Sequence, residues 1–569
     1  MGDSGINAPI ATNAMVCLAV GLSGGWKCPV GYIFTNKVNG EIMFTFIRRV
    51  LDTLLSKNFR IHGIVSDGYS ANVNMFGLFG VREPKNSGRK NTIAQVSDIQ
   101  CSFSYGDQVD PMYCIYDVVH MLKLLRNMLA DYKNLEFDGG VICWSFIHEL
   151  YKLQSDEHIR AANKLSRNHI EFDKHKMKVK LAAQVFSASV ASAIEFCDKD
   201  LKLPQFKGSQ KTVMFIKMID QMFDILNSKN PNQKYFKSPL NRRNVIAKTS
   251  YLNECSEKML SLKYKGNFVC LGQRKRAIVG LVTSIKSITA ISMQLLNRVI
   301  SPFDYILTYR FSQDLLELLF NKIRGKLGRN NNPNVIEFQN IMKQIWHQNL
   351  LKSNSTGNAI VRVKEGEIPG GLLPLQRKKK TRLPIINFEV SSDIDTFVYS
   401  AFHMNCLCYI AGNIVRDIRV KLDCSSCFDA IHESSIDALS SENRALIARK
   451  DNGGLVFPSG SVLKVVEVTD NVMKSVFTQT ASPPSIKWLD LKIASAVMKR
   501  LISRDDIFLT LKDHINDYCA AQSESHLVTL LKLIIHKYLR IKLFDCGKFS
   551  HENISERHLR SKLTLFRNE

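Results

Sequence analysis

The sequence has no long hydrophobic run that would place its 569 residues in a membrane. Its most apolar N-terminal stretch, AMVCLAVGL at 14–22, is far too short to cross a bilayer. This stretch follows the acidic start MGDSG rather than a basic segment, so we expect no signal peptide. Gly2 lacks the Ser or Thr at position 6 that a myristoylation signal requires. We therefore expect no membrane partner.

Two further signatures are missing. The 14 cysteines show no disulfide framework, which indicates reduced thiols in the cytosol or nucleus. No G-x-x-x-x-G-K-[ST] segment is present, so a P-loop is excluded and any nucleotide must be held in another way.

Cys424 and Cys427 form a lone C-x-x-C, with Cys406 and Cys408 upstream. Because one C-x-x-C lacks the second ligand pair of a zinc site, zinc binding there stays open.

Positive charge is what the chain has in excess. Lys and Arg total 77 against 52 Asp and Glu, a net charge of +25, which favours a polyanionic partner and most simply nucleic acid. The segment PLQRKKKTRLP at 374–384 is a candidate nuclear-localisation or DNA-backbone segment, with an ordinary charged linker as the alternative. The hydrophobic content of 45% is that of a folded protein, and the length allows several domains.

The first 135 residues read as an α/β unit. Two β-rich runs joined by SGGW predict an antiparallel hairpin, and EIMFTFIRRVLDTLLSKN predicts a helix. FRIHGIVSDG and PMYCIYD are short buried strands that end at Asp67 and Asp117, each followed by a helix. Two strands ending in Asp predict both carboxylates at one edge of a sheet, where ligands gather in open α/β folds. Taken alone, Asp67 is equally well explained as a helix cap.

Several motifs in collinear order, from about residue 10 to past residue 460, resemble the transposases of the P element and its THAP-domain relatives. They include GLSGGWKCPVGYIF, SDGYSANVNMFGLFG, DVVHMLKLLRN, TYRFSQDLLELLFNKIRG and CYIAGNIVRDIRVKLDCSSC. The resemblance implies an α/β RNase H-like core with a mixed sheet, interrupted by an all-α insertion domain and followed by a mostly helical C-terminal domain. The expected parts are the first part of the core at 1–134, the GTP-binding insertion at 135–300, the end of the core at 301–355, a basic linker at 356–390 and the C-terminal domain at 391–569.

The resemblance also implies a catalytic site in which three acidic residues hold two Mg²⁺ or Mn²⁺ ions for DNA cleavage and strand transfer. Asp67 matches the second acid and Glu317 the third, both as metal ligands. Without the resemblance, Asp314 and Glu317 fit the polar face of an amphipathic helix. The first acid belongs on a strand upstream of the hairpin, whereas Asp3 matches a linker. We therefore expect the first strand to be missing and the chain, as written, to be inactive.

Nucleotide-contacting positions of the family match Asp117, Lys123 and Asp314, and Asp224 of FDILNS is a looser match for a reader of the guanine edge. Lys123 would meet phosphate as a point charge, and an aspartate can accept two N–H bonds from guanine. The alternative for Lys123 and Arg126 is a solvated helix face. The resemblance thus implies GTP as a ligand.

The leading expectation is a P-element-type transposase derivative that acts on DNA in the nucleus, with GTP and Mg²⁺ or Mn²⁺ as cofactors. The alternative is a domesticated, non-catalytic nuclear DNA-binding protein that responds to GTP. An ordinary cellular GTPase is disfavoured because there is no P-loop. The sequence leaves the formation of a homo-oligomer open.

Overall fold

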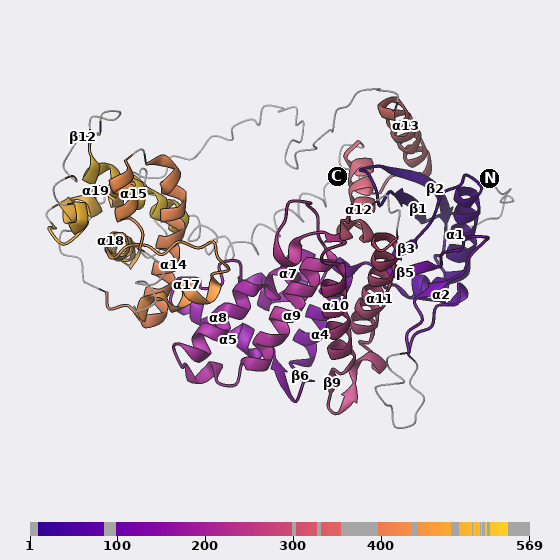
Figure 1. The fold of residues 1–569 in the computed structure, drawn as a ribbon, viewed down its shortest axis with the longest axis horizontal. Coiled ribbons are helices and arrows are strands. Elements are labelled where there is room, and N and C mark those ends of the chain that lie inside the picture. Colours follow the sequence, from indigo (N-terminus) through magenta and orange to yellow (C-terminus); the bar gives the residue numbers. More distant parts are fainter. Residues whose placement is uncertain are drawn as a thin grey trace. The chain divides into compact units, whose positions relative to one another are not determined.

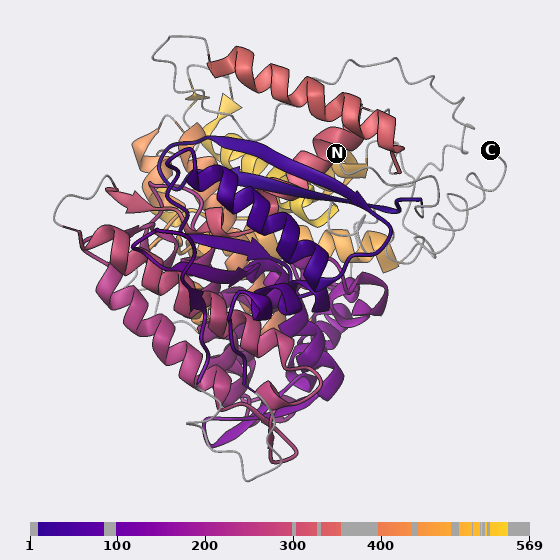
Figure 2. The same cartoon turned by 90° about the vertical axis from the view of Figure 1, so that its right-hand side faces the viewer.

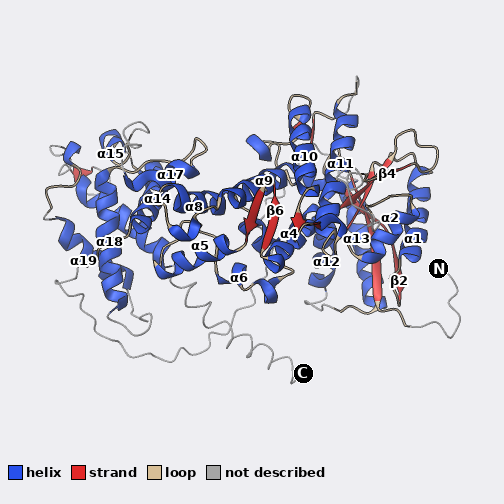
Figure 3. Cartoon of the chain, turned by 90° about the horizontal axis from the view of Figure 1, so that it is seen from below, coloured by secondary structure: helices blue, strands red, loops and turns tan. Residues whose placement is uncertain are grey.

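The computed structural model describes residues 10–84, 98–298, 303–326, 332–353, 397–422, 424–433, 442–478, 489–502, 504–511, 514, 518–519 and 524–543. The chain forms two compact units. Unit 1 comprises residues 1–148, 168–191 and 209–363, and unit 2 comprises 149–167, 192–208 and 364–569. Helices predominate in both units (Figure 3). Asp3 and the basic segment 374–384 lie outside the described residues.

The N-terminal hairpin is confirmed. Strands β1 (Asn13–Val20) and β2 (Lys27–Thr35) pair antiparallel, and the backbone N–H of Gly21 donates to the Trp26 carbonyl at 3.1 Å across the SGGW turn. One face of the hairpin packs against α12 (Asp314–Lys326) and α13 (Val335–Ser353), and β2 packs with its other face on α1 (Gly40–Leu55). Figure 2 shows the indigo hairpin between α1 and α13. Both faces are covered, which explains its nearly continuous apolar sequence.

A second sheet has the strand order β3-β5-β4. Strands β3 (Gly63–Ser66) and β5 (Met112–Tyr116) are parallel, and the short β4 (Ser102–Phe103) is antiparallel to β5. Each parallel strand leads into a helix, α2 (Ser70–Leu78) after β3 and α4 (Val118–Tyr132) after β5. The expected mixed sheet and the order strand, helix, strand, helix are therefore present, while the hairpin forms a two-stranded sheet of its own.

The short β4 pairs with only the first part of β5, and helix α11 (Arg276–Leu296) covers the edge of β5 beyond it. The Ser284 hydroxyl donates to the Tyr116 carbonyl at 2.7 Å and accepts from the Tyr116 N–H at 2.9 Å, and the Ser287 hydroxyl donates to the Cys114 carbonyl at 2.5 Å. Figure 1 shows α11 beside β5. Its mean hydropathy of 1.5 would suit a membrane span, but 72% of that window is buried in the protein. The apolar side chains of α11 therefore pack in the core, and its serines supply the hydrogen-bond partners that the buried edge of β5 needs.

The expectation of an all-α insertion is wrong. Strands β6 (Asn134–Phe137), β7 (Gly140–Cys143), β9 (Lys263–Tyr264) and β10 (Asn267–Phe268) form a four-stranded sheet in the order β10-β9-β6-β7. Each hairpin turns on two residues with positive φ, Asp138 and Gly139 in one and Lys265 and Gly266 in the other. Such residue pairs build the tight turns whose twist matches antiparallel strands. The dipeptide Asp138-Gly139 thus predicts a β-hairpin within a segment whose other residues have a helical pattern.

The rest of the insertion segment is helical. Its helices are α5 (Ser145–Asp156), α6 (Arg167–Ile170), α7 (Val179–Val185), α8 (Ala188–Lys199), α9 (Gln210–Leu226) and α10 (Val245–Leu260). A two-residue pair, β8 (Leu240–Asn241) with β11 (Tyr305–Ile306), joins the region after α9 to the chain that leads into α12. Residues 149–167 and 192–208 belong to unit 2, so the compact units do not coincide with the insertion as one block.

The C-terminal part of unit 2 is mostly helical, as expected. It contains α14 (Ala401–Ile418), α15 (Ser425–Ala430), α17 (Ala445–Lys450), α18 (Gly460–Thr478), α19 (Leu489–Ile502), a helix at 526–543 and the short pair β12 (Tyr518–Cys519) and β13 (Glu524–Ser525). A buried carboxylate ties three of the helices together. Asp470 of α18 lies 2.9 Å from Nε2 of His403 on α14 and accepts the Tyr538 hydroxyl at 2.5 Å.

Candidate functional site

The parallel pairing of β3 and β5 brings Asp67 and Asp117 together. Ser66 is paired with Tyr116 in the register, and the backbone N–H of Asp117 donates to the Ser66 carbonyl at 2.8 Å. Asp67 and Asp117, the next residue on each strand, therefore follow side by side at the carboxyl end of the sheet. This is the placement predicted from the two strand endings, and it is confirmed.

Asp67 shapes the turn into α2. Its Oδ1 accepts the backbone N–H of Tyr69 at 2.9 Å and the side-chain amide of Asn72 at 2.5 Å. These bonds hold the carboxylate in the turn before α2, but the N-cap of α2 is Tyr69 and no side chain caps this helix, so the helix-cap alternative for Asp67 is wrong. These hydrogen bonds are compatible with ligand binding, because a carboxylate offers two oxygens with several acceptor sites.

Gly68 lets two helices approach this turn. A Cβ at Gly68 would lie 2.8 Å from Cδ of Arg276 and 2.9 Å from Cε of Met121, so a larger residue would require the Arg276 and Met121 side chains to move. Arg276 in turn forms a bidentate pair with Glu83, at 2.5 Å and 3.0 Å. Sequence reasoning missed this pair, since its members are 193 residues apart and neither lies in a recognisable motif.

The N-terminus of α12 delivers the other two predicted acids to Asp117. Asp117 is 4% exposed, and burial, followed by the charges of Asp314 and Glu317, raises its pKa to about 7. Hydrogen bonds from the backbone of Val119 and Gln313 lower this pKa but do not offset the increase. Asp314 also pairs with Lys229 at 3.1 Å, just after α9. The structure thus gathers acids from β3, β5 and α12 into one region of concentrated negative charge.

Two cations on α4 lie beside these acids. Lys123 is only 4% exposed, and burial lowers its pKa although the charges of Asp117, Glu317 and Asp67 oppose that effect. Its ammonium lies 3.3 Å from Nδ1 of His120. The alternative of a solvated helix face is therefore wrong for Lys123, because α4 is packed between α7, α11 and the sheet and its polar residues are enclosed.

Arg126, one turn further along α4, is completely buried. Its Nε donates to Asn127 at 2.8 Å and one terminal nitrogen reaches the carbonyls of His175 and Lys176 at 3.4 Å. Within the described part of the chain, its other terminal nitrogen, Nη1, is buried without a hydrogen-bond partner. Burial lowers the pKa of Arg126 to about 10. A buried guanidinium of this kind has capacity for an anionic ligand.

Asp224 is set apart from the other predicted residues. It lies on α9 and pairs with Lys237 at 3.7 Å. Burial raises its pKa, and the charges of Lys237 and Lys248 act in the opposite direction. The end of α9 nevertheless reaches the segment before α12, because the Thr308 hydroxyl donates to the Ile225 carbonyl at 2.5 Å. Asp224 therefore lies on a helix whose end contacts the segment before α12, but it is not among the acids around Asp117.

The predicted acids do not by themselves form a compact metal cage. Across the described residues, the one group of three or more potential metal ligands with ligand atoms within 4.8 Å of one another lies in unit 2, not at this sheet edge. Among the described residues, Asp67 and Glu317 therefore belong to no such compact group of potential ligands.

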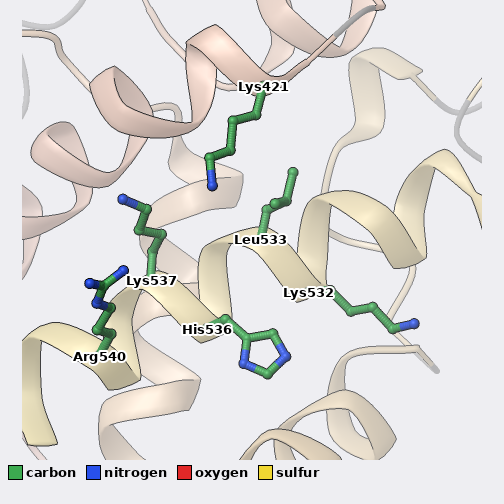
Figure 4. A pocket seen from close by; sticks show the side chains of 6 residues that line it. All are labelled: Lys421, Lys532, Leu533, His536, Lys537 and Arg540. Atoms are coloured by element: carbon green, nitrogen blue, oxygen red, sulfur yellow. The ribbon is translucent and has the colours of Figure 1, made fainter. Parts of the chain in front are cut away.

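Unit 2 carries a basic hollow on its C-terminal helix. Lys532, His536, Lys537 and Arg540 of the helix at 526–543 line it with Leu533, and Lys421 faces them from beyond α14 (Figure 4). Lys537 is paired with Asp417 at 2.9 Å, so part of the positive charge is balanced locally. The cluster of four Lys and Arg side chains provides the charge and hydrogen-bond donors that phosphate groups attract.

Comparison with known proteins yields four family matches in chain order. These are "TNP-like, RNase H N-terminal domain" at 1–80, "TNP-like, GTP-binding insertion domain" at 119–239, "TNP-like, RNase H C-terminal domain" at 309–343 and "DNA transposase THAP9, C-terminal domain" at 398–548. The two core matches contain Asp67 and Glu317, and the insertion match contains Lys123 and Asp224.

Two curated relatives are similar over long stretches. DNA transposase THAP9 of Homo sapiens is 25% identical over 570 residues, covering 96% of this chain and 61% of that protein. Transposable element P transposase of Drosophila melanogaster is 26% identical over 445 residues, covering 74% of this chain and 53% of that protein. The chain thus spans between half and two thirds of the length of these relatives. A solved structure, the Drosophila P element transposase strand transfer complex, aligns with a TM-score of 0.49 and 24% identity over 60% of this chain and 71% of that one.

Proposed function

Because this chain belongs to the family of the THAP9 and P element transposases, we propose that it is a DNA transposase derivative that binds GTP. The observation that carries the proposal is the joint placement of Asp67 and Asp117 at the ends of paired parallel strands, with Glu317 brought to them by α12. Carboxylates in such an arrangement suit hard divalent cations, which take oxygen ligands.

Asp67 and Glu317 are the proposed ligands of Mg²⁺ or Mn²⁺. The concentrated negative charge supports this assignment, because a bound cation would relieve the repulsion that raises the pKa of Asp117. When bound, two such ions activate the attacking oxygen and stabilise the leaving oxygen of a phosphodiester displacement. The chain's own contribution is to hold Asp67 through the Tyr69 N–H and the Asn72 amide, which fixes one carboxylate oxygen in the turn.

Lys123 and Arg126 are the proposed contacts of the GTP phosphates. Both are buried on α4, and the unpartnered Nη1 of Arg126 supports a fit to an anion. Asp117 and Asp314 border the same region and could accept N–H bonds from guanine, and Asp224 is a further candidate for that role. GTP would then neutralise two buried cations, Lys123, whose pKa is lowered by burial and by the charge of Arg126, and Arg126, whose pKa is lowered by burial.

The two proposed metal ligands, Asp67 and Glu317, are one short of the three acids that hold two ions, so we expect the chain as given not to join or cut DNA with Mg²⁺ or Mn²⁺. A plasmid-based strand-transfer assay tests this, with Asp67→Asn as the inactive control. Product above the level of that control would show that another acid of this chain completes the site.

A non-catalytic nuclear DNA-binding protein that responds to GTP is the second candidate function. The basic hollow of Lys421, Lys532, Lys537 and Arg540 favours it, because phosphate contacts can hold DNA without any cleavage chemistry. The two candidates differ in one result: only the first predicts Mg²⁺-dependent strand transfer that is lost in Asp67→Asn.

A further inference from the structure

Two cysteines and two histidines of unit 2 converge on one point. Cys424 precedes α15 and Cys427 lies one turn into it, whereas His514 comes from a distant segment and His526 begins the helix at 526–543. Their ligand atoms all lie within 4.8 Å of one another. Sγ of Cys424 is 3.0 Å from Nε2 of His514, Sγ of Cys427 is 3.1 Å from Nδ1 of His526, and the two imidazole centroids are 4.5 Å apart.

We propose that Cys424, Cys427, His514 and His526 bind one structural zinc ion. In a tetrahedral site with Zn–S near 2.3 Å and Zn–N near 2.0 Å, neighbouring ligand atoms are roughly 3.3–3.8 Å apart. The four ligand atoms of this cluster lie within 4.8 Å of one another, so a shift of about 1 Å brings them to that spacing. Two thiolates and two imidazoles are also the donor set that zinc prefers.

Four protein ligands leave no open position for water or substrate, so the site is structural rather than catalytic. Binding converts the two thiols to thiolates, and their protons pass to solvent as the sulfur–zinc bonds form. The Cys424 sulfur also accepts the backbone N–H of Cys427 at 3.4 Å, a contact typical of a cysteine pair that flanks a metal.

Zinc at this point would fasten the helix at 526–543 to the preceding part of unit 2. The far end of that helix is already held by Asp470, which accepts the Tyr538 hydroxyl and lies 3.6 Å from the Lys542 ammonium. The zinc would hold its near end through His526. Since Lys421 lies shortly before Cys424, the same ion would keep both sides of the basic hollow in place.

The other cysteines of the segment are not part of this site. Cys406 and Cys408 are fully buried on α14, and burial raises the pKa of each thiol, to about 12 and about 11. They behave as small apolar core residues. Cys408 is therefore a matched control for Cys427, and His432, which contacts the Phe428 carbonyl at 3.0 Å, is a control for His514.

Metal analysis of the full chain tests the proposal. Protein purified without chelators should contain about one zinc ion per chain, and Cys427→Ala and His514→Gln should each lower this at least tenfold. Cys408→Ala and His432→Gln should retain the zinc. Unchanged zinc in Cys427→Ala, or a folded unmodified chain without zinc, would overturn the proposal.

X-ray absorption at the zinc edge keeps the test independent of whether the variants fold. The unmodified chain should show two sulfur and two nitrogen neighbours, with cobalt substitution giving the visible absorption of tetrahedral thiolate coordination. A shell of nitrogen and oxygen alone, or of four sulfurs, would contradict the assignment to these four residues.

Discussion

Asp67 and Asp117 stand side by side because the backbone N–H of Asp117 donates to the carbonyl of Ser66, the residue before Asp67, at 2.8 Å. That single ladder bond fixes where both carboxylates emerge from the sheet. Asp117 is the more deeply buried of the two, and its neighbours Asp314 and Glu317 on α12 add like charge. The arrangement therefore stores electrostatic repulsion that a proton or a cation can relieve.

The stability of α4 should fall as the pH rises from about 4 to about 7. The folded pKa of Asp117, about 7, lies above its ordinary value of 3.8, so the folded state binds the proton more tightly. The favourable contribution is present when the carboxyl is protonated and is lost as it ionises. Asp117→Asn, which keeps the capping oxygen, should slow hydrogen exchange in α4 at pH 8 relative to the unmodified chain at the same pH.

The pH window of this effect should depend on α12. Asp314→Asn removes one of the two repelling charges, so it should lower the pKa of Asp117 and move the loss of protection to lower pH. An identical pH profile in the two proteins would show that burial alone is responsible.

GTP should bind with a Kd of about 1 mM or lower, and Lys123→Ala should weaken binding about tenfold or more. The loss of one charge-assisted hydrogen bond is worth about 1.5–3 kcal/mol, and Lys123 is buried beside Arg126. Lys378→Ala is the control, because it removes the same charge from the basic segment outside the described residues. Titration calorimetry of both variants decides the matter: equal losses would mean that Lys123 contributes only to the general positive field.

Asp470→Asn should destabilise unit 2 by up to about 3–5 kcal/mol, because it leaves buried cationic partners without their counter-charge. Burial would raise the pKa of Asp470, but Lys542, His403 and Tyr538 outweigh it and hold this pKa well below the usual value. The contribution is thus present above the ordinary pKa of 3.8 and is lost as the pH falls through the folded pKa. Chemical denaturation monitored in unit 2 gives the measurement.

Asp506→Asn is the control for Asp470. Asp506 is half-exposed and pairs with Arg504 and Lys464 at the surface, at 2.9 Å and 3.2 Å, where ion pairs contribute little. A loss as large as that of Asp470→Asn would argue against the special role of the buried network.

DNA binding should be strongly salt-dependent and nearly independent of sequence. A chain with a net charge of +25 gains affinity from phosphate contacts and counterion release. Arg540→Ala in the basic hollow should reduce the slope of log K against log salt by about 0.9, and Lys499→Ala on the exposed side of α19 should not. A footprint on one defined sequence that survives high salt would contradict this prediction.

The sequence by itself determined the local elements of the core and the placement of two acids. The hairpin, the helix after it and the strands ending at Asp67 and Asp117 follow from hydrophobic period and turn residues, which are properties of neighbouring positions. The register of parallel strands then places Asp67 next to Asp117 with little further choice. The Asp138–Gly139 turn was equally local, and the all-α expectation failed because the helical pattern around it was given more weight.

Only the tertiary structure decided which distant residues meet. Nothing in the sequence near Cys424 and Cys427 indicates His514 and His526, because the second ligand pair is not a closely spaced motif and comes together only when the helix at 526–543 packs in unit 2. Likewise, Lys123 and Arg126 have the spacing of a solvated face, and their burial follows from the packing of α7 and α11 around α4. Local patterns report on neighbours along the chain, whereas charge burial and ligand convergence depend on contacts between segments far apart in sequence.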